Sequence, residues 1–521
     1  MSDHVELRSG VYVDSVGLMQ VSRQVAATPG VRAAQVAMAT DLNVEVLTGM
    51  GFAVPGHAAP NDLVVAVRAD DEEHLRAGLA AVEAAFAALR PGGRGTGGAA
   101  EGATGQAVPP RTLGRAVAVA GADLALVSVP GRCAAVEAFD AVDRGVSVMV
   151  FSDNVPVEDE VRLKDAAAAR DVLVMGPDCG TAVVAGVALG FANVVDRGPV
   201  GIVAASGTGA QQVMALLDAA GVGTSHCLGV GGRDLSAAVA GRSTRQALAA
   251  LDADPATERI LVVSKPPAPE VLADLEAYAA QLGTPVHWAT LGPGSPDLTA
   301  AVEALLRATG HEVPAWPRWT PAAAVDATGE PGTGPGDRHL RGLFCGGTLA
   351  DEAMLIASPA LGGIRSNIPL SPQLALGTDL TAKDHVVVDF GDDALTRGRA
   401  HPMIDPTLRL ERIATEATDP SCGVLLLDLV LGYGAHADPG PELASAVAGA
   451  RATAAAAGRD LPVVVSLTGT RGDPQGLERT AEALAAAGAV VHLSNAAATR
   501  AAVDLLSPRP GRRPGSDEGQ P

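Results

Sequence analysis

The sequence predicts a multidomain α/β protein with parallel sheets, and three observations lead to that fold class. A chain of 521 residues is too long for one hydrophobic core, so several domains are expected. Hydrophobic residues make up 47% of the composition and aromatic residues only 2%, which favours Val-rich buried strands beside Ala-rich helices. Apolar runs of strand length also alternate with helical segments of about 10–15 residues, a pattern typical of parallel sheets.

Two Gly- and Pro-rich stretches divide the chain into three pieces. Residues 90–111 and 313–337 show no apolar periodicity, so they are predicted to be mobile connectors. The tail from Ser507 has the same composition and is predicted to be disordered.

The first piece, residues 1–90, is predicted to be a small α+β domain. The expected elements, in order, are a strand at 10–15, a helix at 18–28, strands at 32–39 and 61–69, and a helix at 71–89. This order predicts a βαββα sandwich.

The other two pieces alternate strands and helices. Expected strands of the middle piece are 122–129, 146–151, 172–176, 200–205, 225–232, 259–264 and 285–290, with helices from Ala134, Val157 and Gly209. Expected strands of the last piece are 385–391, 423–432, 461–469 and 489–494, with helices from Pro406, Gly440 and Asp473.

Charge and cysteine usage narrow the classes of function. Lys and Arg number 38 against 59 Asp and Glu, a formal charge of −21, so neither nucleic acid nor an anionic membrane is an expected partner. The five cysteines are scattered without a CxxC pair, which predicts no metal site and favours a reducing compartment. The N-terminus has no signal-peptide pattern and no apolar run is long enough to cross a bilayer, so we expect a cytoplasmic protein.

A glycine turn after the strand at 200–205 is the first candidate for an anion site. Helix N-termini at strand ends present free N–H groups and a positive dipole end, and small residues let an anion approach the backbone. The residues of this turn are Ser206, Gly207, Thr208 and Gly209. The alternative interpretation is an ordinary strand-to-helix turn in which Ser or Thr caps the helix.

A second glycine turn follows the strand at 423–432. Its residues are Gly432, Tyr433, Gly434 and Ala435, followed by His436. The alternative is a plain turn before a helix capped near Asp438. Because both turns follow apolar strands in separate domains, we predict that the two helix ends face one shared anion, inorganic phosphate being the expected ligand.

Several motifs in fixed order resemble a known family. The segment GIVAASGTGAQQVMALLDAAG and the turn at 176–180 resemble the succinyl-CoA synthetase α subunit, with a CoA-binding-like truncated Rossmann domain at 112–195 and a ligase domain at 196–312. DFGDDAL and LPVVVSLTGT resemble the CoA-ligase domain of its β subunit, at 338–506. With HVELRSGVYVDSVGLMQVSR and GRAHPMIDP, the whole chain resembles the FdrA family.

The resemblance implies a substrate- or CoA-binding edge in the middle piece. Its residues would be Pro130, Gly131, Arg132, Ser152, Asn154, Pro177, Asp178 and Cys179. CoA is therefore a candidate ligand.

Three departures from succinyl-CoA synthetase bear on the reaction. The GHAG-type loop of its phosphate-carrying histidine is replaced by LGPGSPDL, neither an ATP-grasp module nor a P-loop is recognised, and the TGxxG loop that holds CoA is missing. The resemblance to FdrA then implies a phosphate-dependent carbamoyl or acyl transferase, similar to oxamate carbamoyltransferase in allantoin and purine catabolism, working with partner subunits or as a homo-oligomer. Two alternatives stay open: an acyl-CoA synthetase with a separate ATP-binding subunit, and a non-catalytic metabolite-sensing scaffold.

Two histidines are candidate catalytic residues. His436 follows the second glycine turn and titrates near neutrality when free, and His401 lies in the polar motif after DFGDDAL. The alternatives are a loop histidine at 401 and a structural one at 436.

Charged residues after two strands leave further alternatives. Asp389, Asp392 and Asp393 either bind Mg²⁺, which is left open as a cofactor, or cap the following helix. Lys265 either pairs with an anionic substrate or is solvated.

Overall fold

The computed structural model describes every residue except 12, 14, 90–109, 322–337, 397–399 and 507–521. The predicted tail, most of the first connector and the larger part of the second therefore lie outside the described residues. The described strands form four sheets, and the α/β fold class is confirmed. No described helix is long and apolar enough to span a membrane.

The N-terminal domain is a three-stranded antiparallel sheet with a helix after each strand. The sheet order is β1-β3-β2. The elements are β1 (Ser2–Arg8), α1 (Ser15–Ala26), β2 (Val31–Met38), α2 (Asp41–Gly49), β3 (Leu63–Ala69) and α3 (Glu72–Leu89).

Two predictions for this domain were wrong. The first strand is β1, and the described residues of 10–15 form no strand. This edge strand carries Asp3 and Glu6 and pairs on one side only, so its apolar signal is weak. The short helix α2 was not predicted; Thr40 caps it by accepting a hydrogen bond from the Asn43 N–H at 3.4 Å.

The next sheet is parallel, with the order β4-β5-β6, and helices cover it. Its elements are α4 (Leu113–Ala120), β4 (Leu124–Val127), α5 (Gly131–Val142), β5 (Ser147–Val150), α6 (Val157–Ala168) and β6 (Val174–Met175). A domain boundary at 195 does not match the sheets, because the hairpin at 181–190 joins the following sheet, where Val183 pairs with Cys227.

The six-stranded sheet has the order β12-β11-β9-β10-β7-β8. Its strands are β7 (Thr181–Val184), β8 (Val187–Gly190), β9 (Val200–Ala205), β10 (Thr224–Gly229), β11 (Arg259–Ser264) and β12 (Val286–Thr290). Its helices are α7 (Gly207–Ala219), α8 (Arg242–Ala253), α9 (Pro269–Ala279) and α10 (Leu298–Ala308). Strands β9 to β12 are parallel, so their carboxyl ends share one edge.

The seven-stranded sheet has the order β13-β19-β18-β17-β14-β16-β15. Its strands are β13 (Arg318–Trp319), β14 (His339–Phe344), β15 (Arg365–Ser366), β16 (Val386–Asp389), β17 (Cys422–Val430), β18 (Val463–Thr468) and β19 (Val490–His492). Its helices are α11 (Gly347–Leu361), α12 (Asp393–Thr396), α13 (Thr407–Thr418), α14 (Pro439–Ala456), α15 (Leu477–Ala486) and α16 (Asn495–Leu506). Because β13 pairs with β19, the start of the predicted connector 313–337 is an ordered edge strand.

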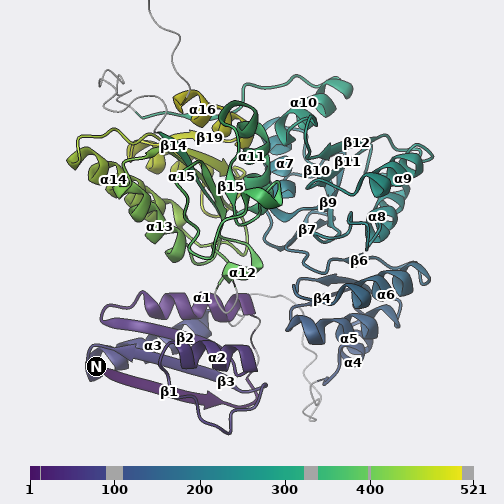
Figure 1. Cartoon of the computed structure of the whole chain (residues 1–521). Coiled ribbons are helices and arrows are strands. Elements are labelled where there is room, and N and C mark those ends of the chain that lie inside the picture. Colours follow the sequence, from purple (N-terminus) through teal and green to yellow (C-terminus); the bar gives the residue numbers. More distant parts are fainter. Residues whose placement is uncertain (12, 14, 90–109, 322–337, 397–399, 507–521) are drawn as a thin grey trace, which may run out of the picture.

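The two large sheets share one hydrophobic core. Figure 1 shows α7 and α11 together at the centre, between the sheets. Met214 of α7 and Met354 of α11 belong to the same buried cluster. The buried amide of Gln212 crosses the boundary, donating to the Leu493 carbonyl at 3.0 Å and accepting from the Thr468 hydroxyl at 3.1 Å. This packing fixes the strand ends of one sheet against those of the other.

Candidate functional site

The first predicted anion turn begins helix α7 directly after strand β9. Ser206 is the N-cap, and its Oγ accepts the Gly209 N–H at 3.0 Å. The N–H groups of Gly207 and Thr208 have no hydrogen-bond acceptor among the described residues. The capping interpretation therefore holds for Ser206, while two amides of the same turn stay available for an anion.

A second free helix end lies at the start of α11, which the sequence analysis missed. Strand β14 ends at Phe344, Gly346 is the N-cap and α11 begins at Gly347. The N–H groups of Gly347, Thr348 and Leu349 have no acceptor among the described residues. The signal was present in the sequence: a buried apolar strand runs into a glycine pair, and the helix begins at once.

The first turns of α7 and α11 touch each other. The Ser206 hydroxyl donates to Thr348 Oγ1 at 2.6 Å, and both side chains are buried. A Cβ atom at position 346 would lie 2.8 Å from Thr208 Oγ1, so Gly346 permits this close approach. The first turns of α7 and α11, each with amides that lack an acceptor among the described residues, are therefore in contact, and we call this place the α7–α11 junction.

A buried carboxylate orients the turn before α11. Asp428 of β17 accepts the N–H groups of Cys345 at 2.8 Å and of Gly346 at 2.9 Å. Arg409 donates to the same carboxylate at 2.6 Å, and both charged side chains are almost fully buried. Since these first two amides are taken, the next amides along the turn are the ones available to a ligand.

Lys265 supplies positive charge at this junction. It follows β11, its side chain is 41% exposed, and its Nζ lies 3.5 Å from Asp351 Oδ2 of α11. A Cβ atom at position 347 would lie 2.6 Å from Asp389 Oδ2 and 3.0 Å from Lys265 Nζ, so both groups reach the α11 N-terminus. Burial opposes the ammonium charge, but the carboxyls of Asp351 and Asp389 outweigh it and raise the pKa of Lys265.

Asp389 is a buried carboxyl that titrates near neutral pH. Removal from water raises its pKa to about 7, although Lys265 acts in the opposite direction. Its Oδ1 accepts the Gly391 N–H at 2.9 Å, while Asp392 accepts the Ala394 N–H at 3.0 Å at the start of α12. The capping interpretation therefore fits Asp392, and Asp389 faces the junction instead.

The predicted substrate- or CoA-binding residues gather at the carboxyl ends of β4, β5 and β6. A Cβ atom at position 131 would lie 2.1 Å from the Asp153 carbonyl oxygen, which shows how closely two of these loops approach. Asn154 and Asp178 have φ values of 52° and 58°, an uncommon conformation that Asn and Asp tolerate better than most residues. Ser152 Oγ accepts the Val129 N–H at 3.0 Å, so its role in the structure is local.

Asp178 links this edge to the junction. Desolvation by the surrounding protein raises the pKa of this carboxyl to about 7; Asp393 and Asp153 act in the same direction, and Lys265 and Arg233 act against them. Cys179 beside it is buried, and desolvation raises the pKa of its thiol to about 12. Asp178 is therefore the residue of this set best suited to exchange a proton near neutral pH.

His401 lies next to Asp389. Its Nδ1 accepts the Met403 N–H at 3.2 Å, so the neutral ring carries its proton on Nε2. A Cβ atom at position 391 would lie 2.8 Å from that Nε2. Burial, with a contribution from Arg409, lowers the pKa of His401 to about 4, which suits a hydrogen-bond donor rather than a base at neutral pH.

The turn at 432–435 presents only some of the bare amides that the prediction required: the N–H groups of Gly434 and Ala435 have no acceptor among the described residues, but the first two amides are paired. Gly432 N–H donates to Gln475 at 3.1 Å and Tyr433 N–H donates to the Ala192 carbonyl at 2.8 Å. Helix α14 begins only at Pro439, and the Gly434 backbone lies against Gly190 and Phe191. This turn contributes to packing between domains, because two of its amides are paired and both of its glycines lie against the backbone of residues 190–193.

His436 lies beyond that turn. Its N–H donates to the Met403 carbonyl at 2.8 Å, and its Nδ1 accepts the Asp438 N–H at 3.0 Å. Its Nε2 is 3.9 Å from Glu442 Oε1, and burial with nearby Arg23 lowers its pKa. These contacts tie His436 to α14 and the N-terminal domain, whereas His401 is tied to the junction.

Comparisons with known proteins agree with this architecture. Residues 343–505 match the family described as CoA-ligase, and residues 1–103 match the family described as AllF, heavy metal-associated domain. The chain is 37% identical over 512 residues to YahF of Escherichia coli strain K12, an uncharacterized protein, covering 95% of this chain and 97% of that protein.

More distant similarities concern parts of the chain. It is 30% identical over 160 residues to the α subunit of ADP-forming succinate–CoA ligase from Aquifex aeolicus, covering 30% of this chain and 51% of that subunit, about half its length. A solved structure, PH0766 from Pyrococcus horikoshii, is 14% identical, with a TM-score of 0.27 over 74% of this chain and 84% of that chain.

The heavy-metal description of the first family does not fit the residues present. Soft metals prefer thiolate ligands, and residues 1–103 contain no cysteine. Within the described parts of the chain, no group of three His, Cys, Asp or Glu side chains is arranged to hold a metal ion.

Proposed function

The chain belongs to the FdrA-like family of proteins related to succinyl-CoA synthetase, and we propose that it transfers a carbamoyl or other acyl group to or from inorganic phosphate where α7 and α11 meet. One observation carries the proposal: two helix N-termini with unpaired amides are in contact, and the Lys265 ammonium lies beside them.

The chemistry follows from the charges of the junction. Amides at two helix ends and an ammonium group favour a phosphate, and they stabilise negative charge that develops on a transferring oxygen. Asp178 and Asp389, with pKa values of about 7, can each give or take a proton near neutral pH. His401 donates a hydrogen bond from Nε2 at the edge of the same region.

The reaction can be tested directly with the full chain and its candidate partner subunits. The FdrA-like assignment makes a ureido acid such as oxalurate the natural donor, so incubation with oxalurate and phosphate should yield oxamate and carbamoyl phosphate. The reverse reaction, from oxamate and carbamoyl phosphate, should release phosphate. Failure in both directions, with the Lys265→Met variant indistinguishable from the original chain, would refute the transfer.

A second candidate function is favoured by the edge at β4, β5 and β6. Its residue Asp178 interacts electrostatically with Lys265 of the phosphate junction, which favours a ligand that contacts both. The similarity to succinate–CoA ligase α subunits supports an acyl-CoA ligase that borrows an ATP-binding partner. Such an enzyme would form a CoA thioester only with ATP and the partner present. A thermal shift with CoA but no thioester would instead support a metabolite-sensing protein.

A further inference from the structure

Arg233 lies on the loop that follows β10, at the side of the site formed by the smaller parallel sheet. Its Nη2 donates to the Val155 carbonyl at 2.8 Å and to Glu160 Oε2 at 2.9 Å. Its Nε and Nη1 groups have no acceptor among the described residues, and the side chain is 42% exposed. The guanidinium is therefore held by one nitrogen and can bind a ligand with the others.

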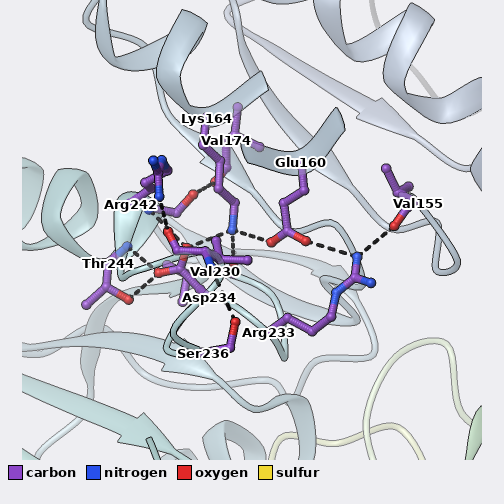
Figure 2. A network of polar contacts seen from close by, with 12 residues as sticks. Val155, Glu160, Lys164, Val174, Val230, Arg233, Asp234, Ser236, Arg242 and Thr244 are labelled. Atoms are coloured by element: carbon purple, nitrogen blue, oxygen red, sulfur yellow. Dashed lines mark hydrogen bonds and ion pairs between the residues drawn. The ribbon is translucent and has the colours of Figure 1, made fainter. Parts of the chain in front are cut away.

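A buried ionic chain holds this arginine in place, as Figure 2 shows. Glu160 Oε1 accepts from Lys164 Nζ at 2.8 Å, and Lys164 also donates to Asp234 Oδ1 at 2.7 Å and to the Val230 carbonyl at 3.0 Å. The Lys164 and Asp234 side chains are 0% exposed and that of Glu160 is 1% exposed. With Arg233, two cations and two carboxylates balance each other.

Such a network is an unusual way to join two domains. Burying charges costs free energy that apolar side chains would not lose, so a buried ion pair is weak support for stability alone. Asp234 Oδ2 additionally accepts from the Thr244 N–H at 2.8 Å and the Thr244 hydroxyl at 2.6 Å, which anchors the chain to α8. Of the four charged residues only Arg233 reaches the surface, and the Glu160 carboxylate of the buried network holds its guanidinium.

Arg233 lies beside the candidate site: at the preceding position, 232, a Cβ atom would lie 3.1 Å from Asp178 Oδ2, so the loop that carries Arg233 packs against Asp178. Its charge acts on the carboxyls of Asp178 and Asp393, and Lys265 acts on the same two groups from the junction. A ligand bound beside Asp178 would therefore be attracted by both cations. Because desolvation raises the pKa of Asp178, that carboxyl repels an anion less near neutral pH than an ordinary aspartate would.

We propose that Arg233 is a substrate-binding residue that holds a carboxylate of the acyl substrate while its reacting end lies at the α7–α11 junction. The planar guanidinium fork matches the two oxygens of a carboxylate. Glu160, Lys164 and Asp234 are its positioning residues. This inference rests on the proposed function, because it takes the phosphate junction to be the other half of the substrate site.

Titration calorimetry of the full chain with two probes separates the two ideas. Inorganic phosphate reports on the junction, and succinate, a small dicarboxylate, reports on Arg233. Arg233→Met should weaken succinate binding at least tenfold while changing phosphate affinity less than twofold, and Arg233→Lys should fall between. Glu160→Gln should weaken succinate binding in the same direction, with no further loss when combined with Arg233→Met.

Arg242→Met is the matched control. Arg242 is also drawn in Figure 2, but its guanidinium is taken by Asp165 at 2.7 Å and by the Val239 carbonyl at 2.6 Å. This control should bind succinate as the original chain does. Equal succinate affinity in Arg233→Met and the original chain, or no succinate binding by the original chain, would overturn the assignment. Neither result would affect phosphate binding, so the proposed function would be judged separately.

Discussion

Two glycine turns leave neighbouring strands of the same sheet and do different things. Strands β14 and β17 are paired, and each ends in a glycine-containing segment. After β14 the helix begins at Gly347, and three amides of its first turn have no acceptor in the described part of the chain. After β17 the next helix begins only at Pro439, and the first two amides of the glycine turn donate to Gln475 and Ala192.

The difference teaches that glycine after a buried strand has two separate uses. At position 347 glycine leaves room for the groups of Asp389 and Lys265, so it makes space for polar chemistry. At position 432, where φ is +117°, a Cβ atom would lie 2.6 Å from the Ala192 carbonyl, so it permits domain packing. The distance between strand end and helix start distinguishes the two cases.

Removing the Lys265 ammonium should have the largest effect on the first turn. Lys265→Met deletes a charge-assisted contact worth about 2 kcal/mol, so phosphate should bind about 30-fold more weakly, while Lys265→Arg should retain part of the affinity. Calorimetric titration with phosphate measures the change. Unaltered phosphate affinity in Lys265→Met would show that this lysine does not take part in anion binding.

Matched glycine substitutions should sharpen the contrast between the turns. Gly347→Ala places a methyl group against Asp389 and Lys265, so phosphate affinity should fall about tenfold. Gly432→Ala should lower the melting temperature through its clash with Ala192 and leave phosphate affinity unchanged in the folded protein. A loss of phosphate affinity in Gly432→Ala but not in Gly347→Ala would indicate that the anion binds at the second turn. Thermal melts and titrations of both variants give the answer.

His401 and His436 allow the same comparison between the α7–α11 junction and the second glycine turn. His401→Phe keeps a ring but removes the neutral N–H donor beside Asp389, which is worth about 1 kcal/mol, so phosphate affinity should fall about fivefold. His436→Gln alters contacts with Asp438 and Glu442 and should change affinity less than twofold. If His436→Gln instead lowered phosphate affinity more than the variant at 401 does, His436 rather than His401 would be the candidate catalytic histidine.

The pH dependence should be the smallest of these effects. Asp178 and Asp389 have raised pKa values of about 7, so both lose their negative charge as pH falls from 8 to 6. Anion affinity should therefore rise about threefold over that range, since less negative charge opposes the ligand. Sulfate is the suitable probe because it does not titrate there. Asp389→Asn should bind sulfate more tightly at pH 8 and show a flatter profile; an unchanged profile would contradict the role given to Asp389.

The sequence predicted the periodic parts of this protein well. Apolar strands such as 200–205 and 461–469, and the helices after them, carry periods that follow from burial. The prediction failed at β1 and α2, where an edge strand and a capped short helix have little apolar signal. It also failed to identify Gly346 and Gly347, because a glycine pair in sequence does not reveal which amides will find partners in the folded chain.

The hydrogen-bond and ion-pair partners of charged residues could not be predicted either, because the tertiary structure determines them. Asp428 lies in the middle of a buried strand in the sequence, yet in the fold it takes two amides of another strand's turn and pairs with Arg409. Lys265 was left between substrate binding and solvation, and its distance to Asp351 follows only from how the two large sheets meet. Charged residues of this kind carry no periodic signal.

A crystal structure of the full chain soaked with inorganic phosphate tests the central claim most directly. The anion should lie within hydrogen-bonding distance of the Gly207 and Thr208 amides, the Gly347 and Thr348 amides, and Lys265 Nζ. Phosphate bound instead at 432–435, or absent from the α7–α11 junction at saturating concentration, would contradict the account.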